Sequence, residues 1–124
     1  MDTDILVHTD HEIKKAQFNN QSWDAICDKI ISQLPENVYI SFDIDGLQPW
    51  LCPGTGTPVP GGLLLEEASY LLEKLADSGR KIIGFDLCEV SPGADEWDGN
   101  VGSRVLYKLC VLAAKNRKFG NLGI

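Results

Sequence analysis

Two stretches of the chain are mostly apolar and are rich in β-branched and aromatic side chains. The first runs from Val38 to Asp43 and the second from Lys81 to Val90. Short runs of this kind, bounded by turn residues, predict buried strands. Strands that are apolar on both faces usually lie in the middle of a parallel sheet. A shorter apolar run at residues 4–8 predicts a further strand.

Apolar residues at helical spacing predict helices between and after these strands. The clearest pattern follows Ser22, a good N-cap residue, and Pro35 ends it. Asn100 is the expected cap of the last helix. The predicted helices are residues 10–18 with Asp10 as cap, 22–34, 64–78 with Gly79 after it, and 100 onward. The apolar face expected for the last helix comprises Val101, Val105, Leu109, Leu112 and Ala113.

The predicted strands and helices alternate along the chain. Alternation of this kind predicts the α/β class, with a parallel sheet and helices on both of its faces. Three strands would make a small sheet that leaves an edge open. The 124-residue chain is therefore expected to be part of a larger sheet, and so a partial domain.

Composition narrows the possible partners. The chain has 11 basic and 18 acidic residues, a formal net charge of −7. Nucleic acid needs a basic face and an anionic membrane would repel this charge, so neither partner is expected. The four cysteines include no closely spaced pair typical of structural zinc. We recognise no signal peptide and no apolar run near the roughly 20 residues of a membrane span. The simplest expectation is a cytoplasmic protein with free thiols.

Two carboxylates, Asp43 and Asp45, come at the end of the first buried strand. The carboxyl ends of strands are where open α/β sheets place their chemistry, and hard divalent cations favour carboxylate oxygens. Residues i and i+2 of a strand point to the same side, so the two charges would repel each other unless a cation lies between them. The pair therefore predicts metal ligands. The alternative is a pair of aspartates that cap the following turn.

A loop at residues 44–62 follows, and its length predicts a functional role. The glycines of its segment 53–58 permit close approach to a ligand, although a rigid surface loop would have the same composition. Glu89 lies at the end of the second strand, at the same predicted edge as Asp43. It could pair with a cationic substrate or orient a nucleophile, or it could simply face water. Asp86, inside that strand, is expected to be structural.

Two further pairs of residues, two histidines and two tryptophans, can be explained without a role at a site. His8 and His11 match no zinc motif, and a turn capped by Asp10 accounts for them. Trp50 and Trp97 lie in the two predicted loops, where they could line the mouth of a site or serve as packing anchors.

The motifs are far more specific together than singly. Ser-Phe-Asp-Ile-Asp at 41–45 is followed by Gly-Leu-x-Pro, then by Pro-Gly-Thr-Gly-Thr-Pro at 53–58, then by Gly61-Gly62. Gly-Phe-Asp-Leu-Cys-Glu-Val-Ser-Pro follows at 84–92. This series closely resembles the ureohydrolase family, which includes arginase, agmatinase and formimidoylglutamase. The resemblance extends from about residue 38 to the end of the last helix.

The resemblance implies a three-layer α/β/α fold and a binuclear manganese site at the strand ends. Asp43 and Asp45 match a pair of metal-binding aspartates in the family. Glu89 matches the glutamate that engages the substrate guanidinium, and Thr55 matches a loop threonine near the substrate. The partner so implied is a small guanidino molecule such as arginine or agmatine, and homo-oligomers are common in the family.

The chemistry implied by the resemblance is hydrolysis of that guanidino group. Two metal ions about 3.5–4 Å apart lower the pKa of a bridging water. The resulting hydroxide attacks the guanidinium carbon, and the tetrahedral intermediate collapses to urea and an amine. Glu89 is expected to hold the planar cation by charge-assisted hydrogen bonds.

Departures from the family pattern leave other functions open. The family's two upstream metal motifs, Gly-Gly-Asp-His and Asp-Ala-His-x-Asp, have no match here, and Gln48 stands where the family usually has aspartate. Residues 1–124 therefore look like the C-terminal portion of a single ureohydrolase domain. One alternative is an inactive truncated fragment that acts only by association.

A second alternative is a phosphatase of the haloacid dehalogenase type. Phe-Asp-Ile-Asp-Gly at 42–46 resembles the first motif of those enzymes. That motif continues with threonine, whereas Leu47 follows here.

Overall fold

The computed structural model describes residues 4–121, with side chains described as far as residue 117. The chain divides into two compact units, Met1–Leu34 and Pro35–Ile124. Each unit is described separately below. The second unit contains the sheet and every residue that the sequence predicts to act on a metal or a substrate.

Helix α1 of the first unit (Asp10–Phe18) has the predicted bounds but a different cap. The Thr9 hydroxyl oxygen accepts the Glu12 N–H at 3.2 Å, and a Glu12 carboxylate oxygen accepts the Thr9 N–H at 3.1 Å. This reciprocal pair is a capping box. The prediction that Asp10 caps the helix is wrong, because Asp10 is already its first helical residue.

Helix α2 (Trp23–Ser32) confirms the predicted cap, since the Ser22 hydroxyl oxygen accepts the Ala25 N–H at 3.0 Å. The strand predicted at residues 4–8 is wrong, because the structure assigns no strand to this segment. Ile5 is 74% exposed, and Leu6 and Val7 are also exposed. An apolar run becomes a strand only where a neighbouring strand pairs with its backbone groups.

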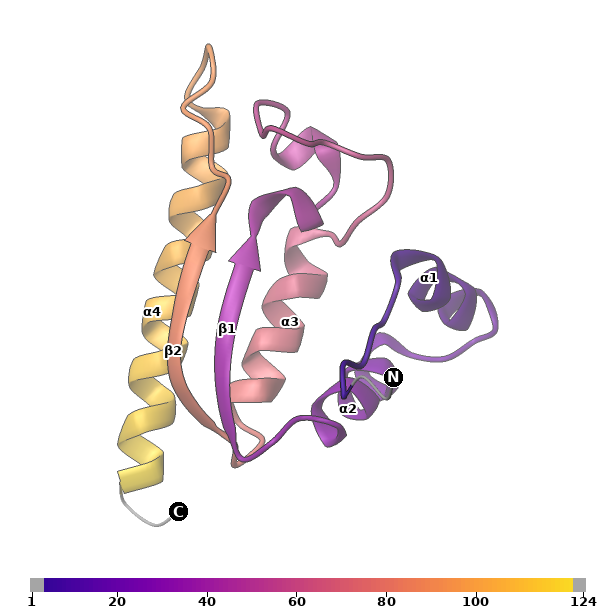
Figure 1. Ribbon diagram of the computed structural model, residues 1–124, viewed down its shortest axis with the longest axis vertical. Helices are drawn as coiled ribbons and strands as arrows, with labels where there is room; N and C mark the ends of the chain where they lie inside the picture. Colours follow the sequence, from indigo (N-terminus) through magenta and orange to yellow (C-terminus); the bar gives the residue numbers. More distant parts are fainter. Residues whose placement is uncertain (1–3, 122–124) are drawn as a thin grey trace. The chain divides into compact units, whose positions relative to one another are not determined.

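The sheet of the second unit consists of β1 (Asn37–Asp43) and β2 (Lys81–Cys88), which pair in parallel as predicted (Figure 1). The register places Asp43 opposite Cys88, after one irregularity near the start of β1. Both strands therefore deliver their carboxyl ends, and the loops that follow, to the same edge of the sheet.

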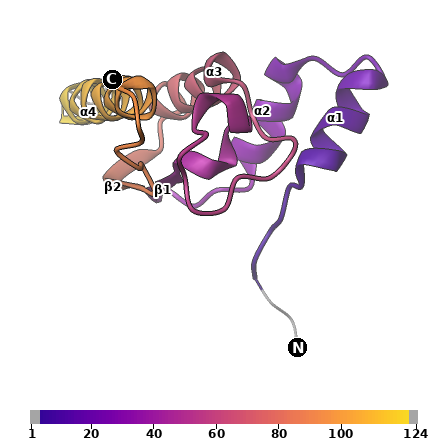
Figure 2. The same ribbon diagram turned by 90° about the horizontal axis from the view of Figure 1, so that it is seen from above.

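Two helices, α3 (Leu65–Ala76) and α4 (Trp97–Asn121), lie on the same face of this sheet (Figure 2). They enclose a core with Ile40 and Phe42 of β1 and with apolar residues of β2. The apolar face predicted for α4 is confirmed, with Val101, Val105, Leu109 and Leu112 buried and Ala113 packed against the core. The α/β class is thus confirmed, while residues 35–124 supply one helix layer of the expected two.

The opposite face of the sheet carries Tyr39 and Ile83, which are 54% and 53% exposed. Among the described residues of the second unit, the strands are therefore covered on one face only. This differs from the prediction that apolar runs of this kind are covered on both faces.

Helix α4 begins at Trp97 and not after Asn100, so the predicted cap is wrong. An Asp95 carboxylate oxygen instead accepts the Trp97 N–H at 3.0 Å. Gly79, predicted to follow α3, has a φ of 85°, a conformation in the left-handed region that glycine adopts readily. Among the described residues, no helix is long and apolar enough to cross a membrane.

A single buried amide joins α4 to the start of β2. The Asn116 side-chain oxygen accepts the Ile82 N–H at 2.9 Å. Its amide nitrogen donates to the carbonyls of Ala76 at 3.0 Å and Arg80 at 2.9 Å. Asn116 thereby fixes the turn between α3 and β2 against α4. Buried backbone groups of this kind are costly to leave unpaired.

Replacing Asn116 with leucine, which has a similar shape, should lower the free energy of unfolding by roughly 2–4 kcal/mol, since three hydrogen bonds are lost and two of them are buried. Chemical denaturation monitored by circular dichroism measures this. Asn100→Leu is the matched control on the same helix, because Asn100 is exposed and its side-chain oxygen accepts from Arg104 Nε of the same helix. Equal losses in the two variants would contradict the anchoring role.

The long loop after β1 is ordered by its own backbone bonds. It contains two short turns, η1 (Ile44–Gly46) and η2 (Pro49–Leu51). Leu47 and Leu63 form an isolated bridge, and Leu63 N–H donates to the Gly46 carbonyl at 3.0 Å. Ile44, Leu47 and Leu51 are buried in the core beside α3 and α4. The loop is therefore a packed part of the unit.

Gly62 lies so close to this turn that a side chain would not fit. Its φ is 96°, and a Cβ there would lie 2.8 Å from the Gly46 carbonyl oxygen and the Leu47 backbone. Gly62→Ala should therefore destabilise the unit by more than Gly79→Ala. Gly79 has a similar φ of 85°, but a Cβ there would meet nothing within 4 Å. The backbone conformation alone should cost about 1–2 kcal/mol in each variant. Thermal unfolding of both variants measures the difference, and equal midpoints would refute it.

Candidate functional site

Asp43 and Asp45 lie together at the carboxyl end of β1, but not on one strand. Asp43 is the last strand residue, and Asp45 belongs to the turn η1. The expected strand geometry therefore applies to Asp43 and not to Asp45. Asp43 Oδ1 accepts the Asp45 N–H at 3.2 Å, which is the turn-capping contact offered as the alternative. Asp45 Oδ2 in turn accepts the Thr57 hydroxyl at 2.5 Å.

The ionisation of Asp43 responds to its surroundings. Partial desolvation raises the pKa of Asp43, and the side chain and negative charge of Asp45 raise it further. The Asp45 N–H opposes this rise in pKa by stabilising the charged form. A cation beside Asp43 would stabilise the charged form of this carboxyl group.

Glu89 follows β2 directly and has a φ of 66°, in the left-handed region that few residues other than glycine adopt. Its backbone carbonyl accepts the Thr55 hydroxyl at 3.0 Å. A Cβ added to Gly56 would lie 3.6 Å from Glu89 Oε2, so the carboxylate lies beside the loop 53–58. The structure thus brings Thr55 and Glu89 together from two separate motifs.

Asp86 has the structural surroundings expected for it. Its carboxylate accepts hydrogen bonds from the hydroxyls of Tyr39 at 3.0 Å and Ser41 at 2.9 Å, and from the Cys88 thiol at 3.3 Å. These three donors hold the pKa of Asp86 below its ordinary value. Asp86 therefore joins the two strands on the face that the helices leave open.

Three residues at the site were not found from the sequence. Thr57 contacts Asp45. Cys52 is buried, and its thiol donates to the Ile44 carbonyl at 3.2 Å. Burial first, and then the nearby carboxylates, raise the pKa of that thiol. Asp98 is buried at the start of α4 and accepts the Gly54 N–H at 2.9 Å. The alternation of Gly and Thr at 54–57 could have signalled Thr57, whereas nothing local to Asp98 indicates its contact.

Both tryptophan side chains are exposed, Trp50 at 58% and Trp97 at 43%, so neither is buried as a packing anchor would be. The Trp97 indole N–H donates to the Trp50 carbonyl at 3.0 Å, which ties α4 to the loop after β1. In the first unit, His8 Nε2 lies 2.7 Å from the Gln33 side-chain oxygen, a structural contact.

The carboxylates suit manganese chemically, because Mn²⁺ is a hard cation that takes oxygen ligands. They do not make a complete site. Within residues 4–121, no group of three or more His, Cys, Asp or Glu side chains is arranged to hold a metal ion. Asp43 and Asp45 therefore do not form a complete metal site with other described residues.

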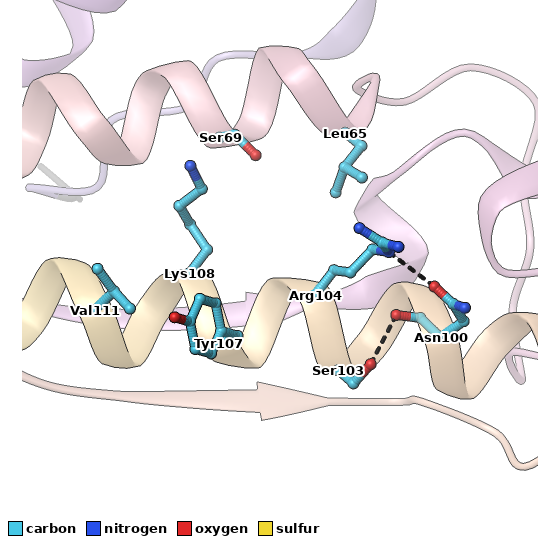
Figure 3. A pocket seen from close by; sticks show the side chains of 8 residues that line it. All are labelled: Leu65, Ser69, Asn100, Ser103, Arg104, Tyr107, Lys108 and Val111. Atoms are coloured by element: carbon cyan, nitrogen blue, oxygen red, sulfur yellow. Dashed lines mark hydrogen bonds between the residues drawn. The ribbon is translucent and has the colours of Figure 1, made fainter.

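A cavity of about 720 Å³ lies between α3 and α4, away from these residues (Figure 3). Arg104 reaches across it, with Nε bonded to the Asn100 side chain at 2.8 Å. The lining residues are Leu65, Ser69, Asn100, Ser103, Arg104, Tyr107, Lys108 and Val111. This cavity includes none of the predicted site residues, so it is not part of the candidate site.

Comparison with known proteins identifies relatives of the chain. The family model for the Arginase family matches residues 2–112. An agmatinase from Proteus mirabilis is 40% identical over 104 residues, covering 76% of this chain and 33% of the relative. The hepatic arginase of Aquarana catesbeiana is 42% identical over 67 residues, covering 54% of this chain and 20% of the relative.

Among solved structures, proclavaminate amidino hydrolase from Streptomyces clavuligerus superposes with a TM-score of 0.74 at 32% sequence identity. The match covers 87% of this chain and 35% of that chain. The chain therefore spans a third or less of the length of the two curated relatives described, and about a third of this solved structure. The sequence match over most of its length and the shared α/β architecture agree, and the chain belongs to the Arginase family.

Proposed function

We propose that this chain forms part of a ureohydrolase domain that hydrolyses a guanidino substrate to urea and an amine in a manganese-dependent reaction. One observation carries the proposal. The parallel pairing of β1 and β2 brings the loop of Asp43 and Asp45 and the segment of Glu89 to one edge of the sheet, where Thr55 bonds the two together. The names of the relatives, an agmatinase, an arginase and an amidino hydrolase, support the same class of reaction.

The roles of the residues follow from their chemistry. Asp43 and Asp45 would hold manganese, which would act as a Lewis acid that activates water. Glu89 would bind the planar guanidinium by charge-assisted hydrogen bonds and so hold its carbon in place for attack. Thr55, 5% exposed, would position Glu89 through its backbone carbonyl. The acidic net charge of the chain would favour the approach of a cationic substrate.

The proposed activity belongs to a complete ligand set and not to Asp43 and Asp45 alone. A metal site needs a full and oriented shell, and the described residues offer no group of three ligands. The other candidate function is an inactive piece of a ureohydrolase that acts only by association. The face of the sheet that carries exposed Tyr39 and Ile83 favours association, because apolar side chains there gain from being covered. All four cysteines are free thiols, which suits the cytoplasm as the proposed compartment.

Asp45→Asn should lower the pKa of Asp43 toward its ordinary value, because it removes the neighbouring negative charge. A titration of the Asp43 carboxyl carbon by NMR measures the shift. The raised pKa means that the folded state binds this proton more tightly than the unfolded state does. Its contribution to stability is therefore present at low pH and is lost as the pH rises through the folded pKa. Asp77→Asn, which removes a charge paired with Lys115 at the end of α3, should leave the pKa of Asp43 unchanged.

Urea release should require Asp43 and Asp45 once the ligand set is complete. The test combines the manganese-loaded chain with a Proteus mirabilis agmatinase segment that lacks the matching region, and supplies arginine or agmatine. Asp43→Asn and Asp45→Asn should each reduce the rate by at least about 10–100-fold, as the loss of metal-site residues does. Asp77→Asn is the charge-matched control and should keep the rate.

Three outcomes separate the candidate functions. Urea release that survives both substitutions would contradict the assignment of these ligands. A stable complex that binds manganese but releases no urea would favour the inactive associating fragment. Two manganese ions held tightly by the chain alone would show that it carries ligands beyond Asp43 and Asp45.

A further inference from the structure

The start of α4 contacts the loop after β1 through a buried carboxylate. Asp98 is the second residue of α4 and is 3% exposed. Its Oδ1 accepts the Gly54 N–H at 2.9 Å. A Cβ added to Gly54 would lie 3.2 Å from Oδ1, and one added to Gly93 would lie 3.4 Å from Oδ2. The carboxylate therefore fits closely between the two loops at the edge of the sheet, with a glycine on each side.

The contact continues to the residues proposed to bind substrate. Gly54 directly precedes Thr55, whose hydroxyl donates to the Glu89 carbonyl at 3.0 Å. The Thr55 N–H is itself held by the Cys52 carbonyl at 3.1 Å. A continuous path of covalent and hydrogen bonds thus runs from Asp98 through Gly54 and Thr55 to Glu89. Because Glu89 has a left-handed φ, its backbone needs such external support.

A capping role does not account for this placement. An acidic residue in the first turn of a helix stabilises it through the helix dipole, even when the residue is exposed. In α4 the Trp97 N–H is already bonded by the carboxylate of exposed Asp95. Oδ1 of Asp98 instead accepts the Gly54 N–H of the loop. Burying a carboxylate costs free energy unless hydrogen bonds of this kind compensate for the lost water.

We propose that Asp98 is a positioning residue for the candidate site, which holds the Gly54–Thr55 segment against Glu89 through its bond to the Gly54 N–H. The consequence for substrate binding rests on the proposed function, whereas the bond itself does not. Trp97 adds a second point of attachment from the same helical turn, through the Trp50 carbonyl. Removing Asp98 should therefore loosen one loop locally without unfolding the sheet.

The first test measures amide hydrogen exchange by NMR in the unsubstituted chain. Gly54 and Gly56 are both exposed glycines of the same loop, which makes Gly56 a close comparison. The Gly54 amide should exchange at least about tenfold more slowly than the Gly56 amide, because a bond to a carboxylate is one of the stronger hydrogen bonds. Equal rates would overturn the proposal, and this measurement needs no variant that could fail to fold.

The second test compares substitutions in the first turn of α4. Asp98→Ala should speed exchange of the Gly54 amide by about tenfold or more, while the Ile82 amide, bonded to Asn116, changes less. Asp98→Asn keeps an acceptor oxygen and should restore slow exchange. Asp95→Ala removes the cap and should leave Gly54 protected. A uniform acceleration at Gly54 and Ile82 in Asp98→Ala would indicate a general loss of stability and overturn the positioning role.

A kinetic readout links the contact to the proposed function. In the assembled domain that releases urea, Asp98→Ala should raise KM by roughly tenfold with a smaller change in kcat, because it loosens substrate binding. Asp98→Asn should rescue KM. An unchanged KM would overturn the link to substrate binding. If no assembled domain releases urea while Gly54 responds as expected, the proposed function fails and the positioning of the loop by Asp98 stands.

Discussion

Parallel pairing between β1 and β2 is the constraint on which the rest of the second unit depends. Because both strands run in the same direction, the residues that follow them emerge at one edge, with Asp43 opposite Cys88. That edge receives the Asp43–Asp45 pair from one strand and Glu89 from the other. An antiparallel pair would separate these groups by the length of a strand, about 3.3 Å for each residue. The chemistry proposed for the site therefore begins with strand direction.

The loop after β1 contributes both to the hydrophobic core and to the candidate site. Its apolar residues Ile44, Leu47 and Leu51 complete the core under α3 and α4. Its polar residues Asp45, Thr55 and Thr57 form the contacts of the candidate site. Burial of the apolar set fixes the backbone that positions the polar set, so the site gains rigidity from packing. Helix α4 also holds this loop, through the hydrogen bonds of Trp97 to the Trp50 carbonyl and of Asp98 to the Gly54 N–H.

The small sheet of the second unit agrees with the share of its relatives that the chain spans. The chain spans 33% of the Proteus mirabilis agmatinase, and its second unit covers one face of a two-stranded sheet. Metal ligands in an α/β domain come from several strand ends, so few strands supply few ligands. Desolvation is the main cause of the raised pKa of Asp43, and the side chain and negative charge of Asp45 add to it.

Local pattern was enough to predict β1 and β2, α3 and α4, and the presence of Asp43, Asp45 and Glu89 at one sheet edge. Burial and periodicity are encoded by neighbouring residues, and the strand direction follows from the intervening helix. What the sequence alone did not reveal depends on partners distant along the chain. The segment 4–8 is apolar but has no strand assigned, and Asp45 turns away from strand geometry into η1. The bonds of Asn116 to Ile82 and of Asp98 to Gly54 join residues 34 and 44 positions apart. Such contacts are decided by tertiary packing, because only the folded backbone brings a buried donor and its acceptor within reach.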